Sequence, residues 1–200
     1  MLSEVNVNLF RAVNDLGKEY PFLNPVMVFI AEYLLFFLVV GALGYWLTRN
    51  QSNKVMVLCG LLTVLFAEII ARIAGMIHSN HQPFAELANV NQLIEKSVDN
   101  SFPSDHTILF FSLCVTYWLF KRGWGFLMII VAIIVGISRI WVGVHYPADV
   151  FVGSIISILS AVMVYYVVPK QRITMKIIRG YERVEHNLFK KQKESKSKDM

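Results

Sequence analysis

Three short segments of the chain carry side chains that are suited to phosphate chemistry. Residues 101–106 have the sequence Ser-Phe-Pro-Ser-Asp-His, residues 138–139 are Ser-Arg, and residues 145–149 have the sequence His-Tyr-Pro-Ala-Asp. Histidine can act as a nucleophile or carry a proton near neutral pH. The planar guanidinium group of arginine matches the oxygens of a phosphate group. If folding brings these segments together, they predict a site for phosphate chemistry.

The third segment places a histidine and a carboxylate at a useful spacing. His145 and Asp149 are four residues apart, with Pro147 between them. A carboxylate at this spacing can accept a hydrogen bond from one imidazole nitrogen, which leaves the other nitrogen free to attack a substrate. The alternative interpretation is that Asp149 caps a helix and that His145 lies at a membrane interface.

The first segment has the features of a helix start. Pro103 is placed where proline is tolerated, at the first helical position. The free backbone N–H groups and the dipole of a helix start attract anions, so Ser104 and His106 are expected to face a phosphate group. Ser101 can also donate or accept a hydrogen bond there. The alternative for Ser104 is an ordinary helix cap.

Arg139 falls near the end of an apolar stretch, where a charge is costly unless it is paired or hydrated. We therefore interpret it as a phosphate ligand. The alternative is that its long side chain extends to the lipid headgroups.

The rest of the sequence indicates the elements that hold these segments. Hydrophobic residues make up 56% of the chain and charged residues 16%, well below the roughly 25% charged residues of soluble domains. An amphipathic helix is expected over residues 1–20, followed by five apolar stretches. These are residues 26–47, 55–77, 102–120, 124–142 and 150–168. The sequence predicts an all-α fold, a polytopic membrane helix bundle with about five transmembrane helices.

The distribution of basic residues predicts the orientation. Of the 19 Lys and Arg residues, ten lie from Lys170 onward, and the loops near residues 49–54 and 121–122 are also basic. By the positive-inside rule these segments are cytoplasmic. The three chemical segments then lie together at the outer face. We expect a membrane phosphatase domain at residues 1–170 and a basic cytoplasmic tail at 171–200, with membrane lipids rather than nucleic acid as the partner of the tail.

The joint pattern resembles the type 2 phosphatidic acid phosphatase family, which includes vanadium haloperoxidases. One family motif, Ser-Arg-x5-His-x3-Asp, is matched at every defined position by Ser138, Arg139, His145 and Asp149. Another, Pro-Ser-Gly-His, is matched by residues 103–106 with Asp105 in place of glycine. The resemblance covers roughly residues 68–153.

The resemblance implies roles for these side chains. His145 would attack phosphorus, Asp149 would orient it, and His106 would protonate the leaving oxygen and then activate water. Arg139 and Ser104 would bind the phosphoryl oxygens, with Ser138 and Asp105 beside them. The family mechanism needs no cofactor and no metal. A zinc site built from the histidines is the rival interpretation, but it leaves the Ser-Arg pair unexplained.

A further family motif, Lys-x6-Arg-Pro, is degraded in this chain. Gln82 occupies the arginine position and Gly75 the lysine position. Arg72, one helical turn earlier, is a candidate for the missing charge, and Gln82 is a second candidate phosphate ligand. The alternative for Arg72 is an ion pair with Glu68 inside the membrane.

Within the family, the chain is most similar to the bacterial undecaprenyl-diphosphate phosphatases of the bacitracin-resistance type. The similarity lies in the short chain, the expected outward-facing site and the His-Gln-Pro-Phe sequence at residues 81–84. The implied reaction converts undecaprenyl diphosphate and water into undecaprenyl phosphate and phosphate, which recycles the lipid carrier of the cell wall. Phosphatidylglycerophosphate and phosphatidate are alternative substrates. A non-catalytic lipid-binding or transport protein, with Glu32, Glu68 and Arg72 lining a pathway, is the alternative from another class. The sequence carries no indication of an oligomeric state.

Overall fold

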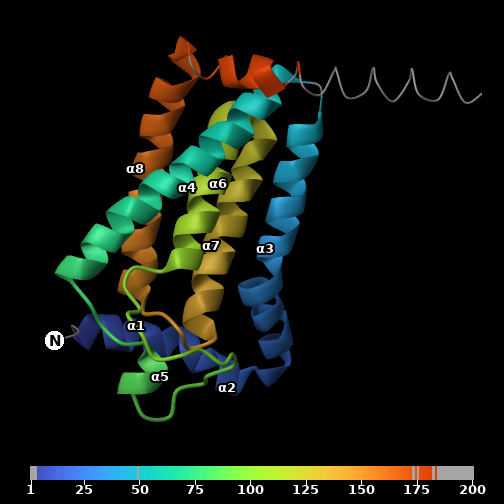
Figure 1. The fold of residues 1–200 in the computed structure, drawn as a ribbon. Coiled ribbons are helices and arrows are strands. Elements are labelled where there is room, and N and C mark those ends of the chain that lie inside the picture. Colours follow the sequence, from blue (N-terminus) through green and yellow to red (C-terminus); the bar gives the residue numbers. More distant parts are fainter. Residues whose placement is uncertain (1–3, 49, 173, 175, 182, 184–200) are drawn as a thin grey trace, which may run out of the picture.

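The computed structural model describes residues 4–48, 50–172, 174, 176–181 and 183, and every regular element among them is helical (Figure 1). This confirms the predicted all-α fold. The α-helices are α1 (Glu4–Asn14), α2 (Leu16–Glu19), α3 (Asn24–Leu47), α4 (Gln51–Ile77), α5 (Pro83–Glu86), α6 (Asp105–Lys121), α7 (Phe126–Trp141) and α8 (Pro147–Val167). Three short 3₁₀ helices, η1 (Pro21–Leu23), η2 (Gly123–Gly125) and η3 (Val168–Lys170), join or extend them.

The five long helices form a bundle with α6 in the middle. Helix α6 packs against α4, α7 and α8, and α3 packs against α4 and α7. The largest group of buried apolar side chains lies along α6, α7 and α8, and consists of Phe110, Phe111, Cys114, Val115, Leu119, Ala132, Val135 and Ala161. Since α6 is surrounded by other helices, its apolar residues form the core of the bundle.

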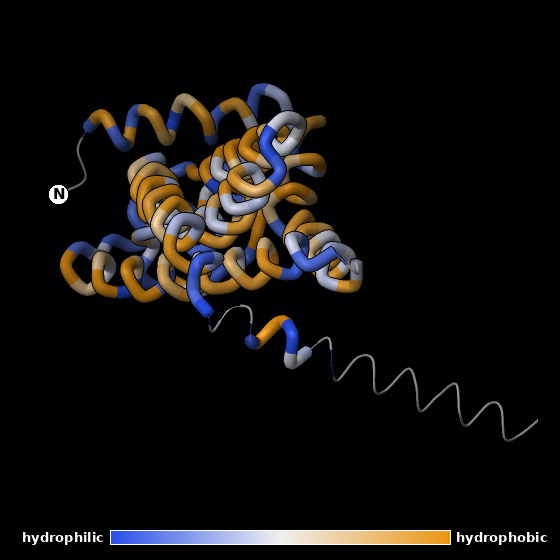
Figure 2. Tube along the Cα trace, turned by 90° about the horizontal axis from the view of Figure 1, so that it is seen from above, coloured by the Kyte–Doolittle hydropathy of each residue, from blue (hydrophilic) through white to orange (hydrophobic). Residues whose placement is uncertain are grey.

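The outer surface of the bundle is also apolar, which is typical of a protein in lipid (Figure 2). Helix α3 shows this most clearly, because Phe36, Leu43 and Leu47 are all more than half exposed. In the described part of the chain, three helical segments are long and apolar enough to cross a membrane: Pro21–Leu47, Gln51–Ile77 and Pro147–Lys170. Helices α6 and α7 are shorter, with 17 and 16 residues. A helix of that length spans only about 25 Å of a hydrocarbon layer that is about 30 Å thick.

One helix start differs from its expected position, and another lies between His145 and Asp149, ahead of its apolar stretch. Helix α6 begins at Asp105, so the prediction of Pro103 at its first position was wrong. The backbone N–H of Ser104 donates to the carbonyl of Asp149 at 3.2 Å, which holds Ser104 in an extended conformation just before the helix. Helix α8 begins at Pro147, three residues before the expected span, because proline is accommodated in the first turn of a helix.

The N-terminal helices lie across one end of the bundle, as Figure 1 shows. Phe10 of α1 is fully buried, and its ring centroid lies 5.5 Å from that of Tyr146. The side chain of Asn6 accepts a hydrogen bond from the backbone N–H of Ala148 at 3.0 Å. The expected amphipathic helix is therefore present and packs against the bundle.

The same end of the bundle holds α5, the loop from α4 to α6, the start of α6, the end of α7 and the start of α8 (Figure 1). The segment after α8 lies at the opposite end. This is the arrangement that the basic loops and tail predicted. Most of the predicted tail, residues 184–200, lies outside the described residues.

Candidate active site

The loop between α7 and α8 presents His145 to the interior. Gly143 starts this turn with a φ of +86°, a conformation that favours glycine. A Cβ atom at this position would also lie 2.8 Å from Val90 and 2.9 Å from the carbonyl of Asn91. The turn therefore requires glycine, and it leads directly to His145, which is buried.

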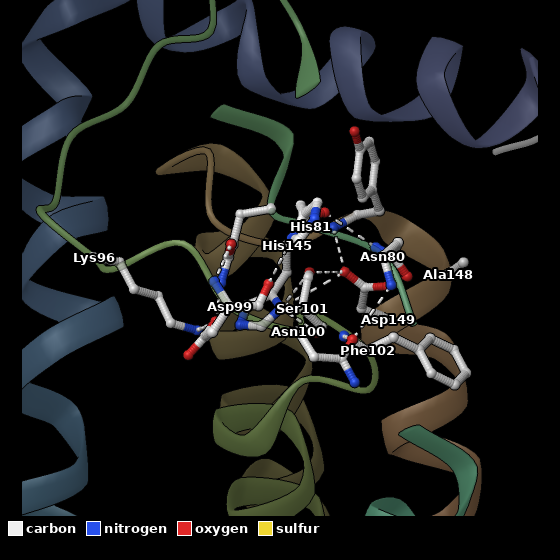
Figure 3. A network of polar contacts seen from close by, with 12 residues as sticks. Asn80, His81, Lys96, Asp99, Asn100, Ser101, Phe102, His145, Ala148 and Asp149 are labelled. Atoms are coloured by element: carbon white, nitrogen blue, oxygen red, sulfur yellow. Dashed lines mark hydrogen bonds and ion pairs between the residues drawn. The ribbon is translucent and has the colours of Figure 1, made fainter. Parts of the chain in front are cut away.

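One ring nitrogen of His145 is held by Ser101. Nδ1 lies 3.0 Å from the backbone carbonyl oxygen of Ser101 and 3.3 Å from its hydroxyl (Figure 3). A carbonyl oxygen can only accept a hydrogen bond, so the geometry assigns the ring proton to Nδ1. The Nε2 atom then keeps its lone pair, which is the form that a nucleophile needs.

Asp149 lies behind His145, but not in direct hydrogen-bond contact. Its Oδ2 atom is 3.6 Å from Nδ1 of His145, which is longer than an ordinary hydrogen bond. The same oxygen accepts hydrogen bonds from the Ser101 hydroxyl and from the backbone N–H of Tyr146, the latter at 2.8 Å. Asp149 therefore both caps α8 and stabilises the segment that holds the histidine.

Burial determines the charge state of His145. Desolvation is the largest influence and lowers the pKa of its imidazole below the ordinary value, and the nearby positive charges of Lys96 and Arg139 act in the same direction. The nearby carboxylate of Asp149 opposes this shift. The lowered pKa keeps the ring neutral at pH 7, so the nucleophilic form predominates.

Arg139 is anchored to α3 through one guanidinium nitrogen. Nη1 donates to the carbonyl of Ala31 at 3.0 Å and lies 3.3 Å from the carboxylate of Glu32. Its Nε atom is buried without a hydrogen-bond partner. Because Arg139 is paired with protein groups inside the bundle, the alternative of a side chain that extends freely to the headgroups does not describe it.

The start of α6 contributes Ser104 and His106. The Ser104 hydroxyl is buried without a hydrogen-bond partner, although Ser104 stands at the position before the first helical residue. It therefore does not act as an ordinary side-chain cap and is free to bind a ligand. His106 lies in the first turn of α6, at the same end of the bundle as the loop that carries His145, and the charges of Arg139, His145 and Lys96 act on it.

Two other predicted phosphate ligands have different surroundings. The Ser138 hydroxyl is buried and donates to the carbonyl of Val135 at 2.7 Å, one turn back in α7. Gln82 is fully buried, and its side-chain amide pairs with Asp99. The structure thus engages both side chains with protein groups.

Arg72 lines a cavity of about 480 Å³ beside the start of α6. Glu68, Gly75, Asn100 and Asp105 also line it, together with Ala71, Met76, Phe102 and Pro103. His145 and Arg139 are not among its described lining residues. None of the salt bridges of the described chain joins Glu68 to Arg72, so the alternative of a close ion pair between them is not found.

Sequence reasoning missed two features of this site. Ser101 was considered only as a group near a helix start, and Lys96 only as a cation on the outward-facing side, not as a residue of the site. The position of Ser101 directly before the Phe-Pro-Ser-Asp-His run was a usable signal. Among the described residues, no group of three His, Cys, Asp or Glu side chains is arranged so that it could hold a metal ion.

Comparisons with known proteins agree with this geometry. The sequence profile described as "PAP2 superfamily" matches residues 57–173. The chain is 49% identical to "Bacitracin transport permease protein BcrC" of Bacillus licheniformis, over 98% of this chain and 97% of that protein. It is 29% identical to "Undecaprenyl-diphosphatase BcrC" of Bacillus subtilis (strain 168), over 94% and 97% of the two chains.

Solved structures share the fold. The crystal structure of Aquifex aeolicus LpxE superposes with a TM-score of 0.65 at 24% identity, covering 81% of this chain and 95% of that one. A transmembrane PAP2-type phosphatidylglycerolphosphate phosphatase from Bacillus subtilis superposes with a TM-score of 0.59 at 22% identity, covering 85% and 90%. The apolar helices and these relatives together show a multi-pass membrane protein. The profile match over more than half of the chain and the full-length relative at 49% identity show that the chain belongs to the PAP2 superfamily.

Proposed function

We propose that the protein is a membrane phosphatase that hydrolyses undecaprenyl diphosphate to undecaprenyl phosphate and phosphate. The observation that carries this proposal is the buried His145, whose Nδ1 is held by the Ser101 carbonyl so that Nε2 is available for attack. Mere binding of a lipid does not require an oriented nucleophile. The names of the Bacillus relatives support the choice of this lipid and a role in bacitracin resistance.

The reaction proceeds in two steps through a phosphohistidine. Nε2 of His145 attacks the terminal phosphorus, and the bond from that phosphorus to the bridging oxygen breaks. Protonated His106 donates its proton to the leaving lipid phosphate. Neutral His106 then takes a proton from water, the water oxygen attacks phosphorus, and the nitrogen–phosphorus bond breaks. The products are the lipid phosphate, inorganic phosphate and the original His145.

Positive charge and hydrogen-bond donors stabilise the transferred phosphoryl group. Arg139 carries the charge, and the Ser104 hydroxyl and the first backbone N–H groups of α6 supply donors. The unsatisfied Ser104 hydroxyl and Arg139 Nε support this role, since a phosphate group would provide the missing acceptors. No metal ion or cofactor takes part in the proposed steps.

The proposed orientation places the site at the outer face of a bacterial cell membrane. The described parts of the basic segments, residues 50–54, 121–122 and 168–172, lie at the end opposite to the site, which supports a cytoplasmic location for that end. Residues 1–170 would form the phosphatase domain and residues 171–200 the basic tail. Membrane lipids surround the bundle, and the apolar tail of the substrate stays among them.

Transport is the second candidate function, because one relative is named a transport permease.

A substrate panel separates the two functions. The purified protein in detergent would be given undecaprenyl diphosphate, phosphatidylglycerophosphate and phosphatidate, and the released phosphate would be measured. We expect the fastest release from undecaprenyl diphosphate. Lipid binding without phosphate release from any of the three would refute the phosphatase proposal.

A further inference from the structure

The site needs more positive charge than the matched family motifs supply. A lipid diphosphate carries several negative charges, whereas Arg139 already shares its charge with Glu32 at 3.3 Å. The degraded motif has Gln82 and Gly75 in place of two cations. Arg72 lines a cavity beside the start of α6, and it is not among the charges that act on His145 or His106. Another cation near the histidines would satisfy this need.

Lys96 is that cation. Both His145 and His106 experience its charge, and each also experiences the charge of Arg139. Figure 3 shows the Lys96 side chain extending to Asp99, in the same polar network as Ser101 and His145. Through Asp99, Lys96 is therefore connected to the polar network around Ser101 and His145, although it lies on the long loop between α4 and α6.

The loop that carries Lys96 is fixed on both sides of it. Before Lys96, the backbone N–H of Leu93 donates to the carbonyl of Val142 at 3.2 Å, in the turn that leads to His145. After it, the backbone N–H of Ser101 donates to the carbonyl of Asn80 at 2.8 Å. Lys96 is thus placed between two anchors, one in the turn that leads to His145 and one at Ser101, which contacts His145.

Gln82 adds a third anchor. Its side-chain nitrogen donates to the carboxylate of Asp99, and its side-chain oxygen accepts from the backbone N–H of Asp99 at 3.1 Å. Asp99 in turn lies 4.0 Å from the ammonium group of Lys96. The residue that replaces the family's arginine therefore holds the partner of Lys96.

The ammonium group of Lys96 is available to a ligand. Its ion pair with Asp99 is long, and the Asp99 side chain is 54% exposed, so the pair is weak. Lys96 also lines a cavity of about 450 Å³ together with Gln92, Glu95 and Ser97. Open space at this position allows a phosphate group to approach the ammonium group.

We propose that Lys96 binds the diphosphate of the substrate and, with Arg139, supplies the positive charge of the active site. This inference rests on the proposed function for the identity of the substrate. The assignment of a phosphate-binding site does not depend on which lipid is hydrolysed. Lys96 would take the place of the cations that the degraded motif lacks.

Three variants of the full chain in detergent test this proposal. Lys96→Gln removes the charge, Lys96→Arg retains it, and Lys18→Gln removes a charge from an exposed lysine at the same end of the bundle. Orthovanadate binding, measured by thermal shift, reports on the phosphate site without requiring turnover. We expect Lys96→Gln to weaken vanadate binding about 10- to 100-fold, as loss of a charged hydrogen bond does. Lys96→Arg should stay within about threefold of the wild type, and Lys18→Gln should have no effect.

Turnover gives a second readout that a purely structural role would not affect. Lys96→Gln should raise KM for undecaprenyl diphosphate more than it lowers kcat. It should also move the acid limb of kcat/KM to higher pH, because the charge of Lys96 lowers the pKa of His145. The other charges near His145, those of Asp149 and Arg139, are unchanged in this variant.

The outcomes are distinguishable. Equal vanadate binding by Lys96→Gln and Lys18→Gln would overturn the proposal, and so would a wild-type protein that does not bind vanadate. A third outcome separates the two proposals. If Lys96→Gln binds vanadate more weakly than the wild type, but the wild type releases no phosphate from any lipid, the role of Lys96 is supported and the proposed function is refuted.

Discussion

Replacement of Ser101 by alanine tests how the structure orients the proposed nucleophile. The change removes only the hydroxyl, which donates to Oδ2 of Asp149 and lies 3.3 Å from Nδ1 of His145. The backbone carbonyl of residue 101, which is 3.0 Å from Nδ1, is retained. Asp149 also keeps its hydrogen bond from the N–H of Tyr146. The orientation of His145 should therefore be weakened rather than lost.

The magnitude follows from the one hydrogen bond that disappears. A hydrogen bond to a charged group contributes about 1.5–3 kcal/mol, and about 1.4 kcal/mol corresponds to a tenfold change in rate. If most of this stabilisation is expressed as the imidazole gains positive charge during attack, kcat should fall about 10- to 100-fold. KM should change little, because Ser101 is placed against the histidine and not against the substrate.

The assay is phosphate release from undecaprenyl diphosphate by purified protein, with thermal unfolding measured in parallel. Ser112→Ala is the matched control, because Ser112 is a buried serine like Ser101. Unlike the hydroxyl of Ser101, that of Ser112, in the middle of α6, has no hydrogen-bond partner. Ser112→Ala should keep wild-type kcat. Wild-type kcat in Ser101→Ala, or a loss explained entirely by lower thermal stability, would refute the proposed orientation of the nucleophile.

Other perturbations test the remaining parts of the mechanism. His145→Ala should reduce phosphate release to background in a folded protein, and substantial turnover by this variant would exclude His145 as the nucleophile. Asp149→Asn should lower kcat by about 10²-fold, since the imidazole remains but is held less firmly. Activity should persist after exhaustive chelation and be inhibited by vanadate, and a loss that zinc or magnesium restores would contradict the metal-free mechanism. Because burial lowers the pKa of His145 and only the neutral ring attacks, the acid limb of kcat/KM should lie below about pH 6.5; a limb above that value would contradict this assignment. Arg72 is the alternative to Lys96 for the missing motif charge. If it has that role, Arg72→Ala should strongly reduce turnover and Glu68→Gln should have a milder effect, whereas an active, stable double variant Glu68→Leu/Arg72→Leu would exclude a catalytic Arg72.

Much of the fold could be predicted because lipid imposes strong constraints on sequence. Apolar stretches of helical length predicted all five long helices, and the positions of basic residues predicted which ends lie together. These two patterns predicted that Arg139, His145 and Asp149 lie at one end of the bundle. In the structure they lie at the end of α7, in the following loop and at the start of α8, which share one end of the bundle. Their catalytic roles stay predictions.

The features that escaped prediction depend on backbone atoms and long-range pairs. The acceptor for His145 Nδ1 is a main-chain carbonyl, and every residue type has one, so the sequence carries no signal for it. The pairing of Gln82 with Asp99 joins positions 17 residues apart, in a segment whose only described helix is the short α5. Resemblance to the family motif suggested a phosphate ligand at Gln82, whereas the folded loop engages its amide with a neighbouring carboxylate.

The pairing of Arg139 with Glu32 explains two intramembrane charges that the sequence left separate. The residues are 107 positions apart, and an unpaired charge within the membrane is costly. Before substrate binds, Glu32 offsets the charge of Arg139 and lowers the free-energy cost of an empty site. The Glu32 side chain is 43% exposed, whereas the Arg139 side chain is 3% exposed. Solvent or lipid headgroups can therefore stabilise Glu32 when an arriving diphosphate competes with it for the guanidinium group. In the proposed mechanism, this arrangement keeps Arg139 stable without substrate and leaves it able to bind phosphate.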